Sequence, residues 1–340
     1  MFTSPQGRTL AFTPLGFGGA PLGNMHRVLA ESEASATVRA AWDAGVRYFD
    51  TAPFYGHGLS EARIGAALAG EARDSFVLST KVGRLLEPCA SGEEDSGIYR
   101  ATPPFRIRFD YSHDAVMRSF EESLSRLGVD RIDILYVHDL EPGHHTPAEA
   151  YEGRWRELTA GGGWRALEGL RASGAVAAIG LGVNEAVACE RMLGEVDPDI
   201  FLLAGRYTLL EQAPLHGLLP ACEQRGVGVV AGGPFNSGVL ARPDGTFNYA
   251  AAPADVLARV ARLRALCARF DTLLPAAALA FVAAHPAVIS VIPGGQTPQE
   301  VTANAAMMAR DIPAGLWAAL KDEGLIDPAA PVPEPEPAAC

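Results

Sequence analysis

The amino-acid sequence predicts a closed (β/α)8 barrel, and three observations lead to this fold class. Apolar segments of strand length alternate with helical patterns along the chain, which indicates a parallel sheet covered by helices. The length of 340 residues lies within the range of roughly 200 to over 400 residues usual for such barrels. The first glycine-rich strand lacks the G-x-G-x-x-G pattern of an open dinucleotide-binding sheet, so we expect the sheet to close.

Each element is predicted from its local pattern. A segment that follows a Pro-Gln-Gly turn forms one arm of an N-terminal β-hairpin, residues 8–13. Short apolar runs are expected as strands at 15–20, 46–50, 75–81, 132–138, 175–181, 200–203, 227–231 and 288–292. Helical patterns, several ended by glycine, are expected at 33–44, 60–69, 114–127, 164–172, 185–193, 214–224, 254–270, 276–284, 298–309 and 314–321. Ser60 is expected to cap the second of these helices.

Two long connections follow the third and fourth strands. Residues 83–112 and most of residues 139–162 show no clear element, and loops of this length usually serve a function. Both leave the carboxyl ends of strands, where barrel active sites lie. We expect one barrel domain over residues 1–326, followed by a proline-rich, disordered tail over residues 327–340.

Composition excludes several classes of partner. The chain has 28 basic and 40 acidic residues, a net charge of −12, and no basic run, which argues against nucleic acid and anionic membranes. No stretch predicts a transmembrane helix or a signal peptide. The five cysteines are scattered, which favours free thiols in a reducing cytoplasm and no metal site. We expect a cytoplasmic protein that acts on a small molecule, with its oligomeric state open.

Polar residues follow three successive predicted strands. Asp50, Lys81 and His138 stand at the strand ends, and Tyr55 follows Asp50 on a loop bounded by proline and glycine. Adjacent strand ends share one rim of a barrel, so Lys81 is expected to pair with Asp50, whose burial would otherwise be costly. The same ammonium is expected to lower the pKa of Tyr55. A neutral His138 is expected to donate a hydrogen bond to a substrate oxygen.

Each of these four residues has an ordinary interpretation when it is taken alone. Asp50 could cap a strand end, Lys81 could be solvated, and His138 could be a structural histidine. Tyr55 could be an ordinary loop aromatic. Their arrangement at consecutive strand ends favours catalysis.

Two small-residue loops follow the seventh and eighth strands. Residues 232–238 read Gly-Gly-Pro-Phe-Asn-Ser-Gly, and residues 293–300 form a Pro-Gly-Gly turn that opens a helix. Backbone N–H groups and a helix N-terminus favour a phosphate. Such turns are common individually, but together at this position in a barrel they indicate a ligand that carries phosphate.

With these residues in place, the chain resembles the aldo-keto reductase superfamily over nearly its whole length. The matching motifs are Asp50-Thr51-Ala52-x-x-Tyr55, Ser79-Thr80-Lys81, Val137-His138, and Ile292-Pro293-Gly294 through Asn304. The chain is more specifically similar to the L-fucose (D-threo-aldose) 1-dehydrogenase branch, which includes D-arabinose, galactose and pyridoxal 4-dehydrogenases. That closer resemblance is carried by residues 15–23, 109–121, 133–139, 180–184 and 204–210.

The resemblance implies a nicotinamide cofactor that lies extended across the barrel mouth. It assigns Tyr55 as the proton shuttle, Asp50 and Lys81 as its tuning pair, and His138 as the substrate orienter. Phe54 is a further expected substrate contact, with Asp139 and Arg206 as weaker candidates. The expected cofactor contacts are Gly19, Ala20, Asp50, Asn184, Tyr207, Gly233, Pro234, Asn236, Ser237, Gly238, Gly294, Gln296, Thr297, Gln299 and Asn304.

The sequence departs from the usual reductase pattern at several of these positions. Val183-Asn184 replaces the usual Ser-Asn, Ala204 replaces a glutamine, and Gly232 replaces the tyrosine that stacks on the nicotinamide. We expect Phe235 or Tyr207 to fill that face. Gln296 and Thr297 bring no positive charge for a 2′-phosphate, so NAD is expected to be preferred over NADP.

The expected reaction is oxidation of an aldose of the L-fucose, D-arabinose or L-galactose type at C1 to the lactone, with hydride transfer to the nicotinamide. Alternatives within the superfamily are a pyridoxal 4-dehydrogenase and a general aldehyde or ketone reductase. Two other classes stay open at this point. One is a Schiff-base lyase with Lys81 as the nucleophile, and the other is a cofactor-sensing binding module that turns over slowly.

Overall fold

A computed structural model describes residues 1–334, and a parallel sheet of eight strands forms its centre. The strands follow one another in the order β12-β11-β10-β9-β8-β5-β4-β3. Bridges from Leu15 to Val291 and from Gly18 to Gly294 join the two ends, so the sheet closes into the predicted barrel. The bounds are β3 Phe17–Gly18, β4 Tyr48–Asp50, β5 Val77–Val82, β8 Ile134–His138, β9 Ala178–Val183, β10 Ile200–Ala204, β11 Gly228–Gly232 and β12 Val288–Ile292.

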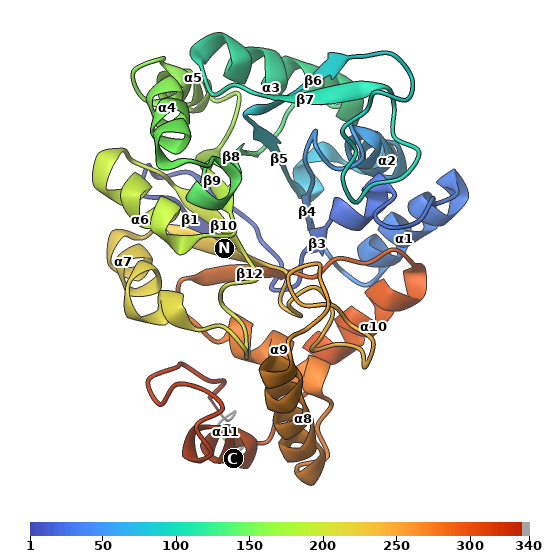
Figure 1. Cartoon of the computed structure of the whole chain (residues 1–340), viewed down its shortest axis with the longest axis vertical. Helices are drawn as coiled ribbons and strands as arrows, with labels where there is room; N and C mark the ends of the chain where they lie inside the picture. The colour runs from blue at the N-terminus through green and yellow to red at the C-terminus, as the bar shows by residue number, and fades with distance from the viewer. Residues whose placement is uncertain (335–340) are drawn as a thin grey trace.

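Helices surround the strands (Figure 1). Those of the repeating units are α1 Glu31–Asp43, α2 Leu59–Leu68, α3 His113–Leu127, α5 Gly163–Ser173, α6 Ala186–Glu195, α7 Leu218–Arg225, α9 Leu274–Ala283 and α10 Pro298–Met308. Helices α4 Ala148–Leu158, α8 Ala254–Arg269 and α11 Ala314–Asp322 are additions to them. Four 3-10 turns complete the described helices: η1 Ala20–Gly23, η2 Arg73–Ser75, η3 Pro142–His144 and η4 Ala213–His216.

Side chains fill the barrel, which confines the chemistry to its rim. The predicted N-terminal hairpin, β1 Phe2–Thr3 with β2 Thr9–Leu10, contributes Leu10 to the cluster inside the barrel. Tyr48 lies in the same cluster, and its hydroxyl is 3.0 Å from the Ser79 hydroxyl and 3.2 Å from that of Tyr136. Inward-pointing layers of this kind leave no pore, so a substrate can approach only at the ends of the strands.

The two long connections contain regular structure, which corrects the prediction that they had none. Strands β6 Arg84–Pro88 and β7 Phe105–Phe109 form an antiparallel hairpin within residues 83–112, and this hairpin lies near α3 in Figure 1. Helix α4 occupies much of residues 139–162. Each insertion follows a strand of the barrel and therefore lies on the rim that carries the predicted site.

The predicted helix cap at Ser60 is also wrong. Gly58, with φ 90°, precedes the first residue of α2, so the helix starts two residues earlier than a serine cap would place it. Ser60 is fully buried, accepts a hydrogen bond from the Thr51 hydroxyl at 2.8 Å and donates one to the Gly19 carbonyl at 2.8 Å. The residue ties α2 to the strand ends that hold the site.

The first residues of the proline-rich segment pack against the rest of the protein. The Asp327 amide donates to the Gln212 side chain at 2.7 Å, and Ala330 is 1% exposed. The predicted disorder is therefore wrong from Asp327 to Ala330, and residues 335–340 lie outside the described part of the chain. Among the described helices, no single one is long and apolar enough to cross a membrane, although α8 and α9, bent by 96°, meet that test as a pair.

Candidate active site

A buried ion pair joins the ends of strands β4 and β5. Lys81 Nζ donates to Asp50 Oδ2 at 2.7 Å and to the Thr51 carbonyl at 2.7 Å. The Ser79 hydroxyl donates to the other Asp50 oxygen at 2.7 Å. The side chains of Lys81 and Asp50 are 1% and 2% exposed. Burial raises the pKa of Asp50, and the contacts with Lys81 and Ser79 oppose that rise.

Tyr55 lies over this pair, as the order of strand ends predicts. Lys81 Nζ is 4.7 Å from the centroid of the Tyr55 ring. The pKa of Tyr55 is nevertheless raised well above its usual value, first because of burial and then because of the nearby Asp50 charge. The expectation that Lys81 lowers this pKa is therefore wrong for the protein alone, because burial, and then the Asp50 charge, outweigh the effect of the ammonium. Tyr55 is present as a protonated phenol.

His138 faces Tyr55 from the end of β8. The two ring centroids are 5.7 Å apart, with an interplanar angle of 87°. Burial, and then the positive charges of Arg84 and Lys81, lower the pKa of His138 well below its usual value, so the ring is neutral, as its predicted role requires. Nδ1 is buried without a hydrogen-bond partner. Leaving a lone pair without a partner at this position costs less free energy than leaving an N–H group without one. We therefore assign the proton to Nε2, which makes this nitrogen a donor.

Three further residues border the site, and sequence patterns did not select them as a group. Arg84 from β6 is 5% exposed, and its guanidinium carbon lies 4.0 Å from the centroid of the Phe54 ring. Tyr99 contacts Phe54 edge-on, with centroids 5.3 Å apart. Asp139 forms an ion pair with Arg84 and lies 3.4 Å from His138 Nε2. The alternating pattern of Phe105-Arg106-Ile107-Arg108-Phe109 was the available signal for the hairpin that brings Arg84 here.

The expected substrate contacts separate into two groups. Phe54 lies beside His138, with ring centroids 6.2 Å apart, and so borders the site. Arg206 instead pairs with Glu211 at 3.0 Å and contacts Asn248 at 3.2 Å, which gives it a structural role. Ligand atoms of Asp139, Glu141 and His144 come within 4.8 Å of one another, but Arg84 already binds the Asp139 carboxylate, so this cluster gives no support for a metal.

Several expected cofactor contacts lie at the rim after strands β3, β9 and β11. The Gly19 amide donates to the Asp50 carbonyl at 2.8 Å, and Ala20 opens η1 beside it. Asn184 follows β9 and donates its side-chain amide to the Ala204 carbonyl at 3.2 Å. Past β11, the chain turns through positive φ at Gly233, Asn236, Ser237 and Gly238.

The turn after β11 is less open to a phosphate than its composition suggests. The Asn236 amide donates to the Gly233 carbonyl at 3.0 Å, and the Gly238 amide donates to the Phe235 carbonyl at 2.9 Å. These two N–H groups are used within the turn, which corrects the expectation that they approach a phosphate. Asn236 Oδ1 is buried without a partner, so this side chain retains an acceptor.

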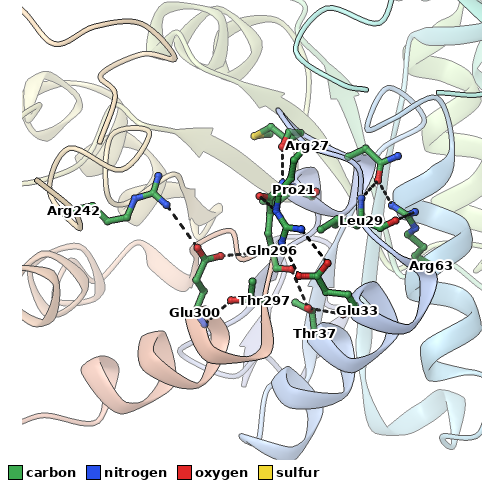
Figure 2. A network of polar contacts seen from close by, with 12 residues as sticks. Pro21, Arg27, Leu29, Glu33, Thr37, Arg63, Arg242, Gln296, Thr297 and Glu300 are labelled. Carbon is green, nitrogen blue, oxygen red and sulfur yellow. Dashed lines mark hydrogen bonds and ion pairs between the residues drawn. The ribbon is translucent and has the colours of Figure 1, made fainter. Parts of the chain in front are cut away.

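Figure 2 shows the predicted cofactor loop after β12. Gln296 donates from Nε2 to the Met25 carbonyl at 2.6 Å and accepts from Arg27 at 3.3 Å. Thr297 caps α10 by accepting from the Glu300 amide at 3.2 Å, and Glu300 accepts from the Gln296 amide at 2.7 Å. The fold also brings in Arg242, 3.7 Å from Glu300. The positive charges that are absent at positions 296 and 297 are thus present nearby on other segments.

Tyr207 does not fit the predicted role of a nicotinamide contact. Its ring is 2% exposed and lies against Phe281 and His285 of the α9 region, with centroids 5.4 Å and 5.5 Å away. Gln299 is exposed and Asn304 partly exposed on α10, and their roles stay predictions. For the described rim as a whole, the N-terminus of α10, the exposed Gly294 and the free acceptor of Asn236 are compatible with a dinucleotide.

Comparison with known proteins places this site in a family. The model of the aldo/keto reductase family matches residues 14–322, and the chain belongs to that family, whose members use nicotinamide cofactors. The chain is 44% identical over 334 residues to pyridoxal 4-dehydrogenase from Microbacterium luteolum, covering 94% of this chain and 96% of that protein. It is 43% identical over 325 residues to D-threo-aldose 1-dehydrogenase from a Pseudomonas species, covering 93% and 95%.

A solved structure supports the same assignment. The chain resembles aldo-keto reductase AKR11C1 from Bacillus halodurans in its holo form with a TM-score of 0.70 and 25% identity. The match covers 96% of this chain and 95% of that one. The predicted barrel and the predicted family are therefore confirmed, and the chain is an oxidoreductase of the aldo-keto reductase type.

The buried ion pair predicts a strong energetic coupling. Asp50→Asn or Lys81→Met alone should each lower the free energy of unfolding by about 3–5 kcal/mol, because each leaves one buried charge without its partner. The double variant should lose clearly less than the sum of the two losses. Urea unfolding of the four proteins measures the coupling, and additive losses would show that the two charges do not depend on each other.

Proposed function

We propose that the protein is an NAD(P)-dependent aldose 1-dehydrogenase that oxidises a cyclic aldose of the L-fucose, D-arabinose or L-galactose type at C1 to the lactone. The observation that carries the proposal is the pairing of a protonated Tyr55 with a neutral His138 over the buried Lys81–Asp50 pair. The 43% identical D-threo-aldose 1-dehydrogenase supports the aldose as substrate.

The chain's own residues supply positioning and proton control. His138 donates from Nε2 to the oxygen on C1 and holds it near Tyr55. Tyr55 accepts the proton of that hydroxyl in the oxidative direction and returns it in the reductive direction. Because the pKa of Tyr55 is raised in the protein alone, its phenol must release its own proton to solvent before it can accept the proton of the C1 hydroxyl. The bound dinucleotide supplies the hydride acceptor and, when oxidised, a positively charged ring.

The ion pairing of Lys81 argues against the Schiff-base alternative. A lysine that forms a Schiff base must present a neutral, free amine, whereas Lys81 Nζ donates to Asp50 and to the Thr51 carbonyl, both at 2.7 Å. The complete set of Asp50, Tyr55, Lys81 and His138 at one rim likewise favours an enzyme over a cofactor-sensing binding module. Trapping with borohydride should therefore leave Lys81 unmodified.

NAD is proposed as the preferred cofactor, with NADP as the alternative. The Glu300 carboxylate lies at the N-terminal end of α10, where it would repel a 2′-phosphate. Arg27 is already paired with Glu33 through contacts of 2.8 Å and 3.0 Å. Arg242 has looser pairs, 3.7 Å to Glu300 and 3.8 Å to Asp244, and is the residue through which NADP would be accepted.

We further propose that the chain forms a single barrel domain and that its partner is a small sugar or aldehyde. The net charge of −12 supports the absence of a nucleic-acid partner. Cys189, Cys222 and Cys267 are buried free thiols, which supports a cytoplasmic location. No feature of the described residues selects an oligomeric state.

A second candidate function is supported by the 44% identical pyridoxal 4-dehydrogenase. A panel of L-fucose, D-arabinose, L-galactose and pyridoxal, each with NAD and with NADP, separates the two candidates through the formation of reduced cofactor. We expect turnover with at least one aldose at a kcat/KM at least about tenfold above that for pyridoxal. Turnover of pyridoxal alone would replace the proposed function with the second candidate.

Charge at the start of α10 should control the choice of cofactor. Thr297→Arg combined with Glu300→Gln should raise kcat/KM for NADP relative to NAD by about tenfold or more, because an ion pair to the added phosphate replaces a repulsion. Thr297→Ala is the matched control, since it also removes the helix cap but adds no charge. An unchanged ratio in the double variant, or a wild-type enzyme that prefers NADP, would contradict the proposal.

A further inference from the structure

A second buried ion pair lies beside His138. One terminal nitrogen of Arg84 contacts Asp139 Oδ2, and the two side chains are 6% and 10% exposed. The same Asp139 oxygen lies 3.4 Å from His138 Nε2, the nitrogen assigned as donor to the substrate. A carboxylate at this distance stabilises an imidazolium, and it commonly raises a histidine pKa by about 1–3 units. Burial, and then the positive charges of Arg84, Lys81 and His144, nevertheless lower the pKa of His138. Among these charges, Arg84 contacts the same carboxylate oxygen and is therefore placed to offset it.

Two aromatic side chains hold Arg84 in a position where its charge can offset that of the Asp139 carboxylate. Its guanidinium carbon lies 4.0 Å from the Phe54 ring centroid and 4.7 Å from that of Phe109, so two aromatic rings fix its plane. Its Nε is buried and has no partner. An arginine in a purely structural role would be expected to satisfy that N–H. Here one terminal nitrogen of the guanidinium contacts the Asp139 carboxylate, while Nε has no hydrogen-bond partner.

The backbone of Asp139 is also constrained. Its φ is 50°, a conformation that is uncommon for residues other than glycine, although Asp and Asn tolerate it. The Asp139 amide donates to the Gly182 carbonyl at 2.9 Å, which anchors the residue to strand β9. Left-handed residues of this kind cluster at functional sites, and this one directs its carboxylate toward both Arg84 and His138.

We propose that Arg84 is a positioning residue for His138, because its ion pair with Asp139 removes the negative charge that would otherwise convert the imidazole into an imidazolium. The ring then keeps a single proton, on Nε2. Asp139 Oδ2 lies 3.4 Å from that nitrogen, but its charge is paired with Arg84, so the proton remains available for the substrate oxygen. The inference rests on the proposed function in one point only, namely that His138 donates its Nε2 proton to the substrate oxygen.

Charged and titratable groups on several elements act on the His138 ring. Lys81 from β5 and Arg84 from β6 lower its pKa, and so does His144 from η3. Asp139 lies next to it, and the Tyr55 ring faces it. The pKa of His144 is itself raised, chiefly by its hydrogen bond with Glu141. Loss of Arg84 therefore removes one positive charge and exposes one negative charge, and both changes favour imidazolium.

The test is a titration of the His138 ring by NMR of 15N-histidine-labelled protein, with the resonance assigned by its absence in His138→Gln. In the wild type we expect the ring to be neutral at neutral pH, with its midpoint at the acid end of the pH range in which the protein is folded. Arg84→Met should raise the midpoint by about one pH unit or more, and Arg84→Lys should keep it low. Asp139→Asn, which tolerates the same backbone conformation, should not raise it. The double variant Arg84→Met/Asp139→Asn should return it to near the wild-type range.

An unchanged midpoint in Arg84→Met, or a raised midpoint in Asp139→Asn, would overturn the inference. If Arg84→Met does not fold, the His138 midpoints in Asp139→Asn and Arg84→Lys still test the inference. If Arg84 acts through its charge, the midpoint stays low in Arg84→Lys. If Arg84 acts through its shape instead, the low midpoint is lost in Arg84→Lys. The acid limb of kcat/KM against pH should move with the midpoint. A moved midpoint with an unmoved acid limb would support the role of Arg84 while contradicting the assignment of His138 to the reacting oxygen.

Discussion

The buried ion pair between Asp50 and Lys81 is the interaction on which the rest of the site depends. It exists because β4 and β5 are neighbours in the barrel, with Asp50 in register with Ser79. The pair sits above a barrel interior already filled by Tyr48, Tyr136 and their neighbours, so neither charge can reach water from below. Each charge is therefore kept in place by the other, and the Tyr55 ring lies 4.7 Å from the Lys81 ammonium.

A second ion pair, next to His138, repeats this principle. Arg84 and Asp139 are also buried, and they come from the hairpin insertion and from the end of β8, respectively. The two pairs leave the site with little net charge while they surround two groups that must hold or give up a proton. Burial is the first cause of the lowered pKa of His138 and of the raised pKa of Tyr55. The positive charges of Arg84 and Lys81 add to the first shift, and the Asp50 charge adds to the second.

The sequence predicted those parts of the structure that depend on local order along the chain. Asp50, Lys81 and His138 were identifiable because each follows an apolar strand, and parallel strands bring their ends to one rim. The alternating pattern of residues 105–109 could have indicated the hairpin that carries Arg84, but no local pattern indicated the contacts of Arg84 with Phe54 and Asp139. The direction of the Tyr55 pKa shift was missed for a related reason: it depends first on how deeply the ring is buried and then on the nearby Asp50 charge, and neither can be read from local sequence. Tyr207 was misplaced because a residue shortly after a strand can turn outward into the helical layer.

The role of Tyr55 in proton transfer is tested most directly by single-turnover hydride transfer in a stopped-flow instrument, with Tyr55→Phe compared with the wild type. The variant keeps the ring over Lys81 and lacks only the hydroxyl. We expect its rate of hydride transfer to fall by about 10²–10⁴-fold, with nucleotide affinity unchanged. A rate close to that of the wild type would show that another group moves the proton, and would contradict the mechanism built on the Asp50–Lys81 pair.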